Sequence, residues 1–307
     1  MKRTRVVLAT VVSVVSLTLA ACGGGGDNNP LGGGASSPAP SDTIVVGSAN
    51  FPESSLLAQI YAGALSSKGV KTSTKLNIGS RETYIPGLQD GSIDLIPEYS
   101  GVLLQYFDKS ATQVSSDDVY AALKTKVPSN LTVLDQSTAE DKDSITVTKE
   151  TADKYSLKSI ADLQPVAGQL TLGGPPEWKT RQTGAPGLKR IYNVVFKEFK
   201  SLDAGGPLTI KALKNGSVQA GDVFTTDPNI VANGWIALED PKNLFAAQNV
   251  LPLINKAKAS QQVSDALNAV SAKLTTEVLL DLDKQIILDK KDPAQVAKQF
   301  LSDNGLG

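Results

Sequence analysis

Histidine is absent from all 307 residues, and cysteine occurs once, as Cys22. Histidine is the side chain most often used near neutral pH as a general base and as a zinc ligand, so its absence weakens the hydrolase and metalloenzyme classes. A single cysteine excludes an internal disulfide and a cysteine-based metal site. The composition therefore predicts no metal site and no cofactor, with stability supplied by core packing.

Catalytic motifs are also missing: the sequence contains no GxSxG elbow and no GxxxxGK[ST] phosphate loop. An enzyme that uses a pair of carboxylates remains an alternative, because carboxylates can perform acid and base steps without histidine. The candidate acids for such a pair are Glu82, Asp94, Glu98, Asp141, Asp143 and Asp222. Each acid is more often a turn cap or a solvated side chain, so we predict no catalytic residue.

Residues 1–21 have the composition of an export signal: Lys2, Arg3 and Arg5 precede an apolar run that ends in "LAAC". The ending resembles a bacterial lipobox, in which the cysteine becomes the lipidated first residue of the mature protein. We therefore expect lipidation at Cys22; the alternative is an ordinary signal peptide with an incidental cysteine. Loss of the leader takes the formal net charge from −1 to −4, which argues against a nucleic-acid partner.

The segment after the leader has the composition of a linker. Residues 23–41 are mainly Gly, Ser, Pro, Asn and Asp and cannot bury apolar surface, so 22–42 are predicted to form a flexible tether. No later stretch is apolar for the roughly 18 residues that a membrane span requires. The folded body is expected to begin at Thr43.

The body alternates between strand and helix patterns. The predicted strands are 43–47, 75–78, 93–97, 132–135, 145–148, 170–172, 196–201 and 250–254. A helix is predicted over 52–69 from its apolar spacing, and 260–304 is nearly all helical in pattern. This order predicts the α/β class, with a helical layer at the C-terminus.

Two pairs of segments echo each other. "LQDGSIDLIPEY" and "LKNGSVQAGDVF" both run through Gly-Ser into a strand and place Tyr99 and Phe224 at the same offset. "IVVGSANF" and "LTLGGPPEW" each end a strand with glycine and then present Phe51 or Trp178. Chance similarity of α/β turns is one explanation. The other is two lobes of like construction that present aromatic side chains at their strand ends, where open α/β sheets bind ligands.

Aromatic rings on opposing loops suit a quaternary ammonium group, whose methyl groups prevent hydrogen bonding while its positive charge is attracted to ring faces. Four motifs together resemble the glycine betaine, choline and proline betaine substrate-binding proteins of bacterial ABC importers. These motifs are "IVVGSANFPES", "IGSRETYIPGLQDGSIDLIPEYSG", "PEWKTRQTGAPGLKRIY" and "LKNGSVQAGDVFTTD". The resemblance spans residues 43–307.

The resemblance implies a two-lobed periplasmic-binding-protein fold of type II, whose lobes are joined by two crossing segments with the ligand cleft between them. Lobe 1 would comprise 43–143 and 249–307, and lobe 2 would comprise 144–248. The family encloses the ammonium group in an aromatic cage and binds the carboxylate with a basic or polar cluster. The implied ligand-binding residues are Asn50, Phe51, Tyr84, Tyr99, Asp141, Trp178, Arg181, Phe224 and Thr225.

Within that set, Arg181 matches the family's carboxylate-binding arginine, whereas Arg81 is expected to hold the adjacent turn by hydrogen bonds to carbonyl groups. The chain departs from some relatives in having Ala49 where they have lysine, Asp143 and Ser144 where they have a tyrosine, and Ile210 where they have an aromatic residue. These differences leave fewer aromatic rings for the cage. They leave open a different, more apolar ligand on the same fold.

The resemblance implies a monomeric, lipid-anchored receptor on the extracytoplasmic face of the cell membrane. Its partners would be a small compatible solute and a membrane permease with a cytoplasmic ATPase. Two other functions stay open on the residues alone. One is an exported enzyme with a carboxylate pair, and the other is a lipoprotein that docks a partner protein through its surface.

Overall fold

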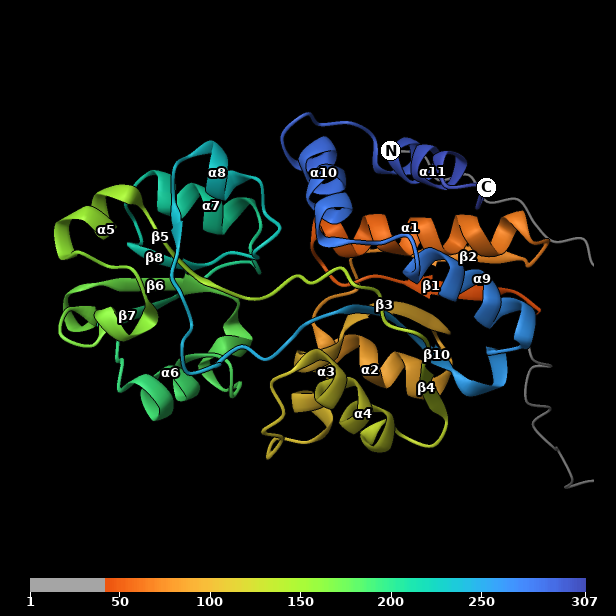
Figure 1. Ribbon diagram of the computed structural model, residues 1–307, viewed down its shortest axis with the longest axis horizontal. Helices are drawn as coiled ribbons and strands as arrows, with labels where there is room; N and C mark the ends of the chain where they lie inside the picture. The colour runs from red at the N-terminus through yellow and green to blue at the C-terminus, as the bar shows by residue number, and fades with distance from the viewer. Residues whose placement is uncertain (1–41) are drawn as a thin grey trace, which may run out of the picture. The chain divides into compact units, whose positions relative to one another are not determined.

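The computed structural model describes residues 42–307. The predicted leader, most of the predicted tether and the predicted lipidation at Cys22 lie outside the described residues. The strands are β1 Ile44–Gly47, β2 Thr72–Lys75, β3 Leu95–Tyr99, β4 Leu131–Val133, β5 Ile145–Val147, β6 Thr171–Gly174, β7 Glu198–Ser201, β8 Ala220–Asp222, β9 Ile236–Ala237 and β10 Val250–Asn255. They form two separate five-stranded sheets (Figure 1).

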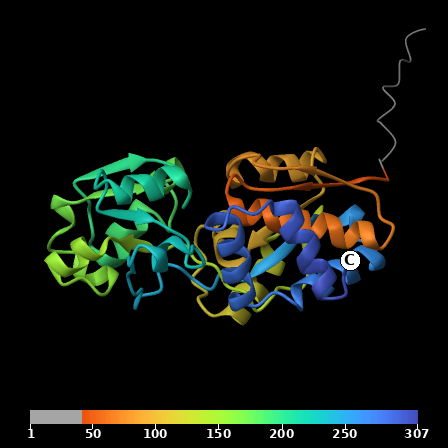
Figure 2. The same ribbon diagram turned by 90° about the horizontal axis from the view of Figure 1, so that it is seen from above.

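Helices lie on the faces of both sheets, as Figures 1 and 2 show. The α-helices are α1 Pro52–Ser67, α2 Arg81–Asp90, α3 Ser100–Phe107, α4 Ser116–Lys126, α5 Lys149–Tyr155, α6 Ala185–Tyr192, α7 Pro207–Lys214, α8 Asn229–Ala232, α9 Gln261–Ser271, α10 Thr276–Ile287 and α11 Pro293–Asp303. Short 3₁₀ turns occur as well, among them η3 Pro176–Lys179.

The two sheets share one topology. The first has the strand order β2-β1-β3-β10-β4, and the second has the order β7-β6-β8-β5-β9. In each sheet three neighbouring strands run parallel, and the fourth, β10 or β5, runs antiparallel to both of its neighbours. The repeated order explains why "LQDGSIDLIPEY" and "LKNGSVQAGDVF" look alike: they are the α2–β3 and α7–β8 units of the two sheets.

The chain crosses between the sheets twice, once between β4 and β5 and once between β9 and β10. The two crossing segments touch at an isolated antiparallel bridge between Glu140 and Asn249. The strands of the first sheet lie in 44–133 and 250–255, and those of the second lie in 145–237. We call the first sheet with its helices lobe 1 and the second lobe 2.

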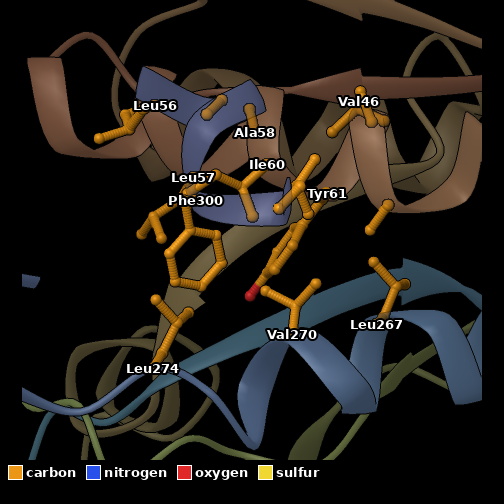
Figure 3. Close-up of a cluster of buried hydrophobic side chains, with 14 of the residues drawn as sticks. Val46, Leu56, Leu57, Ala58, Ile60, Tyr61, Leu267, Val270, Leu274 and Phe300 are labelled. Carbon is orange, nitrogen blue, oxygen red and sulfur yellow. The ribbon is translucent and has the colours of Figure 1, made fainter. Parts of the chain in front are cut away.

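Lobe 1 has apolar packing on both faces of its sheet. On one face α1 packs against α9, α10 and α11, so the C-terminal helical pattern returns to this lobe. Figure 3 shows Leu267 and Val270 of α9, and Leu274 just after it, facing the side chains of α1, with Phe300 of α11 beside them. On the other face the sheet packs against α2, α3 and α4.

Strict alternation along β3 sends neighbouring side chains to opposite faces of the sheet. Leu95 and Tyr99 pack on the α1 face, and Ile96 packs on the α2 face. Because Glu98 is one residue from Tyr99, its carboxylate points toward α2 while the Tyr99 ring points toward α1. The adjacent letters "EY" therefore supply side chains to two different layers of the lobe.

The sequence located most strands to within a few residues; the strand expected before Phe224 is β8, whereas β9 was missed. The largest error at a predicted strand is β2, which spans Thr72–Lys75 rather than 75–78. Its position follows from parallel pairing, since Ile44 lies opposite Thr72 and Gly47 opposite Lys75. Asn77 then adopts a positive φ of 56°, which ends the extended segment.

Candidate functional site

A cavity of about 260 Å³ lies between the lobes, lined by residues of both. Its lining includes seven of the residues predicted for ligand binding: Asn50, Phe51, Tyr84, Tyr99, Asp141, Arg181 and Phe224. Drug-sized ligands occupy pockets of roughly 300–1,000 Å³, so this volume suits a small solute.

Four aromatic rings meet at the cavity, three from lobe 1 and Phe224 from lobe 2. Phe51 is the N-cap residue of α1, and its ring centroid lies 4.9 Å from that of Phe224 and 6.0 Å from that of Tyr99. The contact between Phe51 and Phe224 joins the lobes. Aromatic side chains of both lobes thus line the cavity.

The hydroxyl of Tyr99 is held by a buried acid. It donates a hydrogen bond to Oε1 of Glu53 in the first turn of α1, and the hydroxyl of Thr226 in lobe 2 donates to Oε2 of the same carboxylate at 2.9 Å. Burial raises the pKa of Glu53, although the hydrogen bonds that it accepts act in the opposite direction. Glu53 therefore orients the Tyr99 ring and also links the two lobes.

A second buried acid holds Tyr84. The carboxylate of Glu98 is fully buried and accepts a hydrogen bond from the Tyr84 hydroxyl at 2.6 Å. It also accepts hydrogen bonds from Nε and Nη2 of Arg81, at 3.0 and 2.7 Å. The expectation that Arg81 bonds to carbonyl groups was wrong, because the alternation along β3 places a carboxylate directly beside it.

Arg181 forms an ion pair across the lobes with Glu82, the second residue of α2. Its Nη2 lies 2.8 Å from Oε2 of Glu82, and its Nε lies 3.2 Å from Oε1. Partial burial raises the pKa of Glu82, but the hydrogen bonds and charge of Arg181 outweigh it and bring the pKa to about 2. The arginine predicted to bind a ligand carboxylate thus already has a carboxylate partner from the other lobe.

Asp141 and Thr225 stabilise the first crossing segment. The Thr225 hydroxyl donates to Oδ1 of Asp141 at 3.2 Å, and the Thr226 amide donates to the same oxygen at 3.1 Å. The Thr225 hydroxyl oxygen also accepts a hydrogen bond from the backbone amide of Lys142 at 2.9 Å. Asp141 lines the cavity, whereas Thr225 does not.

Trp178 lies in the core of lobe 2 instead of on the cavity wall. It is fully buried and stacks on Phe245, with ring centroids 6.1 Å apart. Its spacing from Gly174 matches that of Phe51 from Gly47, but Pro175 and Pro176 start the 3₁₀ turn η3, which directs the indole inward. A matching offset after the strand therefore did not give a matching side-chain direction.

Sequence reasoning missed a second group of lining residues. It includes Ser80, Arg81, Val102, Asp143, Pro175, Pro176, Glu177, Leu202, Asp203, Ala204, Leu208, Asp222 and Gln248. Residues 202–208 follow β7 and contain Gly205-Gly206-Pro207, a turn signal at the carboxyl end of a strand. This turn signal in the sequence was overlooked, although it indicates that the loop lies at the site.

A larger groove of about 570 Å³ adjoins the cavity and shares Phe51 and Phe224 with it. Ile210 lines this groove, whereas Ala49 and Asp143 line the cavity itself. Two of the positions at which this chain differs from some relatives, Ala49 and Asp143, therefore lie in the cavity wall. The third, Ile210, lies in the wall of the adjoining groove.

Two further findings concern residues 42–307. Within them no group of three or more metal-ligating side chains is placed to hold a metal ion. No helix in this part of the chain combines the length and the apolar character that crossing a membrane requires.

Residues 42–303 match the family described as the substrate binding domain of ABC-type glycine betaine transport systems. The glycine betaine-binding protein YehZ of Escherichia coli strain K12 is 27% identical over 277 residues, 85% of this chain and 90% of that protein. An ergothioneine transport permease and binding protein of Helicobacter pylori strain G27 is 26% identical over 86% of this chain, which covers 48% of that longer protein.

Solved structures show the same fold. A glycine betaine/carnitine/choline ABC transporter structure matches with a TM-score of 0.67 at 22% identity, covering 86% of this chain and 99% of that one. An OpuAC protein from a lactococcal source, closed on glycine betaine, matches with a TM-score of 0.59 at 14% identity, covering 86% and 96% of the two chains. The fold is thus the two-lobed periplasmic-binding-protein fold of type II.

These findings identify a binding protein and not an enzyme, since the matched family consists of substrate-binding domains. The chain belongs to the family of extracytoplasmic substrate-binding domains of ABC-type glycine betaine transport systems.

Proposed function

We propose that this protein is the receptor of an ABC importer for a quaternary-ammonium compatible solute, bound between the lobes by Phe51, Tyr84, Tyr99 and Phe224. The observation that carries the proposal is the meeting of these four rings, from both lobes, at one small cavity. Each ring face is worth about 0.5–2 kcal/mol to a desolvated cation.

The buried acids behind the rings strengthen this interpretation. Glu53 and Glu98 accept hydrogen bonds from the two tyrosine hydroxyls, so the two rings are held in fixed orientations. Because the ring contact between Phe51 and Phe224 forms only where the lobes meet, a ligand held there favours the closed arrangement.

A second candidate is a longer ligand with an apolar part. The adjoining groove is lined by apolar side chains such as Ile286 and Ile287 and shares two of the four rings with the cavity. A ligand that extended past Phe51 and Phe224 would occupy both spaces. Such a ligand requires separation of these two rings, whereas a small solute does not.

The test is the thermal unfolding midpoint of the purified protein with a panel of solutes: glycine betaine, proline betaine, choline, carnitine and ergothioneine. A ligand at roughly a hundred times its dissociation constant stabilises the native state by about 2.7 kcal/mol. For a domain of this size that raises the midpoint by about 5–10 °C. The same measurement on Phe51→Leu should show a smaller rise, because one ring face is lost while most of the apolar volume stays.

A neutral analogue of choline, in which a tert-butyl group replaces the trimethylammonium group, is the control ligand. It has the same shape without the charge and should leave the midpoint unchanged. Absence of a shift with every cation in the panel would exclude a quaternary-ammonium ligand and favour the longer apolar one.

For the cellular setting we propose a lipid anchor at Cys22 and a permease with a cytoplasmic ATPase as partners, supported by the "LAAC" ending and by the family. A Cys22→Ala variant should move from the membrane fraction to the soluble extracellular or periplasmic fraction, with ligand binding unchanged. Retention of the variant in the membrane fraction would contradict the anchor.

A further inference from the structure

One end of the cavity carries a buried acid that lacks a donor. Asp222 is the last residue of β8, has no exposed surface and lines the cavity. Neither of its carboxyl oxygens has a hydrogen-bond donor from the rest of the described chain. The charged groups that act on it are Asp143, Arg181 and Asp141, which line the same cavity.

The fold holds Asp222 in this position. β8 lies at the centre of the second sheet, parallel to β6 and antiparallel to β5, and Asp222 is paired with Ile145. The backbone is thus fixed by strands on both sides, and the side chain has no exposed surface. A buried acid without a donor costs free energy, and native proteins seldom keep one without a use.

Asp143 lines the same cavity as Asp222. Burial and then the charge of Asp143 raise the pKa of Asp222, while Arg181 acts in the opposite direction. In either protonation state the Asp222 carboxyl group keeps an oxygen that can accept a hydrogen bond. Gln248 gives Asp143 only a long contact of 3.5 Å. The pair is therefore an acceptor that faces the cavity.

The cations near the cavity are already engaged. Arg81 is bound in a fork to Glu98, and Arg181 is bound in a fork to Glu82. Pro175 and Pro176, which follow the neighbouring strand β6 and line the cavity, have no amide hydrogen to offer. A ligand carboxylate at this end would meet two acids and no free donor from these groups, whereas a hydroxyl or an N–H group would meet an acceptor.

We propose that Asp222, paired with Asp143, accepts a hydrogen bond from a hydroxyl or N–H group of the ligand, so that the receptor selects quaternary-ammonium solutes that carry such a donor. This inference rests on the proposed function and names the subclass of solute. Choline has the required hydroxyl, and glycine betaine has no donor.

The test compares choline with its fluoro analogue, in which fluorine replaces the hydroxyl, by titration calorimetry on the full-length protein. Charge and size are nearly equal, so the comparison isolates the donor and needs no variant. We expect choline to bind at least tenfold more tightly. In Asp222→Leu, which removes the acceptor at similar side-chain size, the affinity for choline should fall about tenfold or more, while the affinity for the fluoro analogue should change less than threefold.

Asp153→Asn is the matched control variant, since Asp153 lies on the exposed surface of α5 in the same lobe. It should leave both affinities unchanged. Equal binding of choline and its fluoro analogue, or an Asp222→Leu variant with unchanged selectivity, would overturn this inference and leave the proposed function in place. Failure of every quaternary-ammonium compound to bind would overturn both.

Discussion

Replacement of Arg81 by alanine is expected to destabilise the folded chain by about 3–5 kcal/mol, because the change leaves the Glu98 carboxylate buried without its cation. The side chain of Glu98 has no exposed surface and that of Arg81 is 11% exposed, so solvent cannot replace the lost partner. Burial acts to lower the pKa of Arg81, but Glu98 outweighs it and keeps the guanidinium charged. A loss of this size is a large share of the 5–15 kcal/mol that stabilises a typical domain.

The measurement is urea-induced unfolding at neutral pH, with Arg190→Ala as the control. Arg190 is exposed on α6, so its removal should change the free energy of unfolding by less than about 0.5 kcal/mol. The double variant Arg81→Met with Glu98→Gln should recover part of the loss, because no uncompensated charge is then buried. A single Arg81→Ala variant as stable as Arg190→Ala would show that Glu98 is solvated or protonated in the native state.

The substitution Gly184→Ala is expected to cost about 3 kcal/mol and to abolish ligand binding at moderate concentrations. A Cβ at this position would lie 2.1 Å from the carbonyl oxygen of Trp178 and 2.6 Å from its Cα. Both are backbone atoms, so the conflict can be relieved only by moving the turn. Overpacking of this kind costs about 1–3 kcal/mol, and rigid neighbours place it at the upper end.

The binding effect follows from the path of the chain. The amide of Gly184 donates to the carbonyl of Arg181 at 3.0 Å, so the turn that must move also carries the Arg181 guanidinium. Gly168→Ala is the control, since nothing lies within 4 Å of the added methyl group and stability should stay equal or rise by up to about 1 kcal/mol. Thermal unfolding and calorimetric titration check both variants, and equal results for the two would contradict the steric argument.

Local pattern was sufficient for the class and the order of elements. Periods of two and 3.6 residues are properties of a short stretch of backbone, so most strands of both sheets and the C-terminal helices could be read from spacing, whereas the two-residue strand β9 could not. The echo between 88–99 and 213–224 likewise reports a repeated α–β unit, which the shared sheet topology confirms. The same units bring Tyr99 and Phe224 to one cavity from the two lobes.

Side-chain partners could not be read in this way, because they depend on register between segments far apart in the chain. Arg181 was expected to bind a ligand carboxylate, yet its guanidinium forms an ion pair with Glu82, 99 residues away in the chain. Trp178 follows its strand as Phe51 follows β1, yet two prolines redirect it into the core. The acidic end of the cavity arises only when β8 and the first crossing segment place Asp222 beside Asp143. Residue types and their periods are encoded locally, whereas burial, pairing and the charge of a cavity arise only from the packed arrangement.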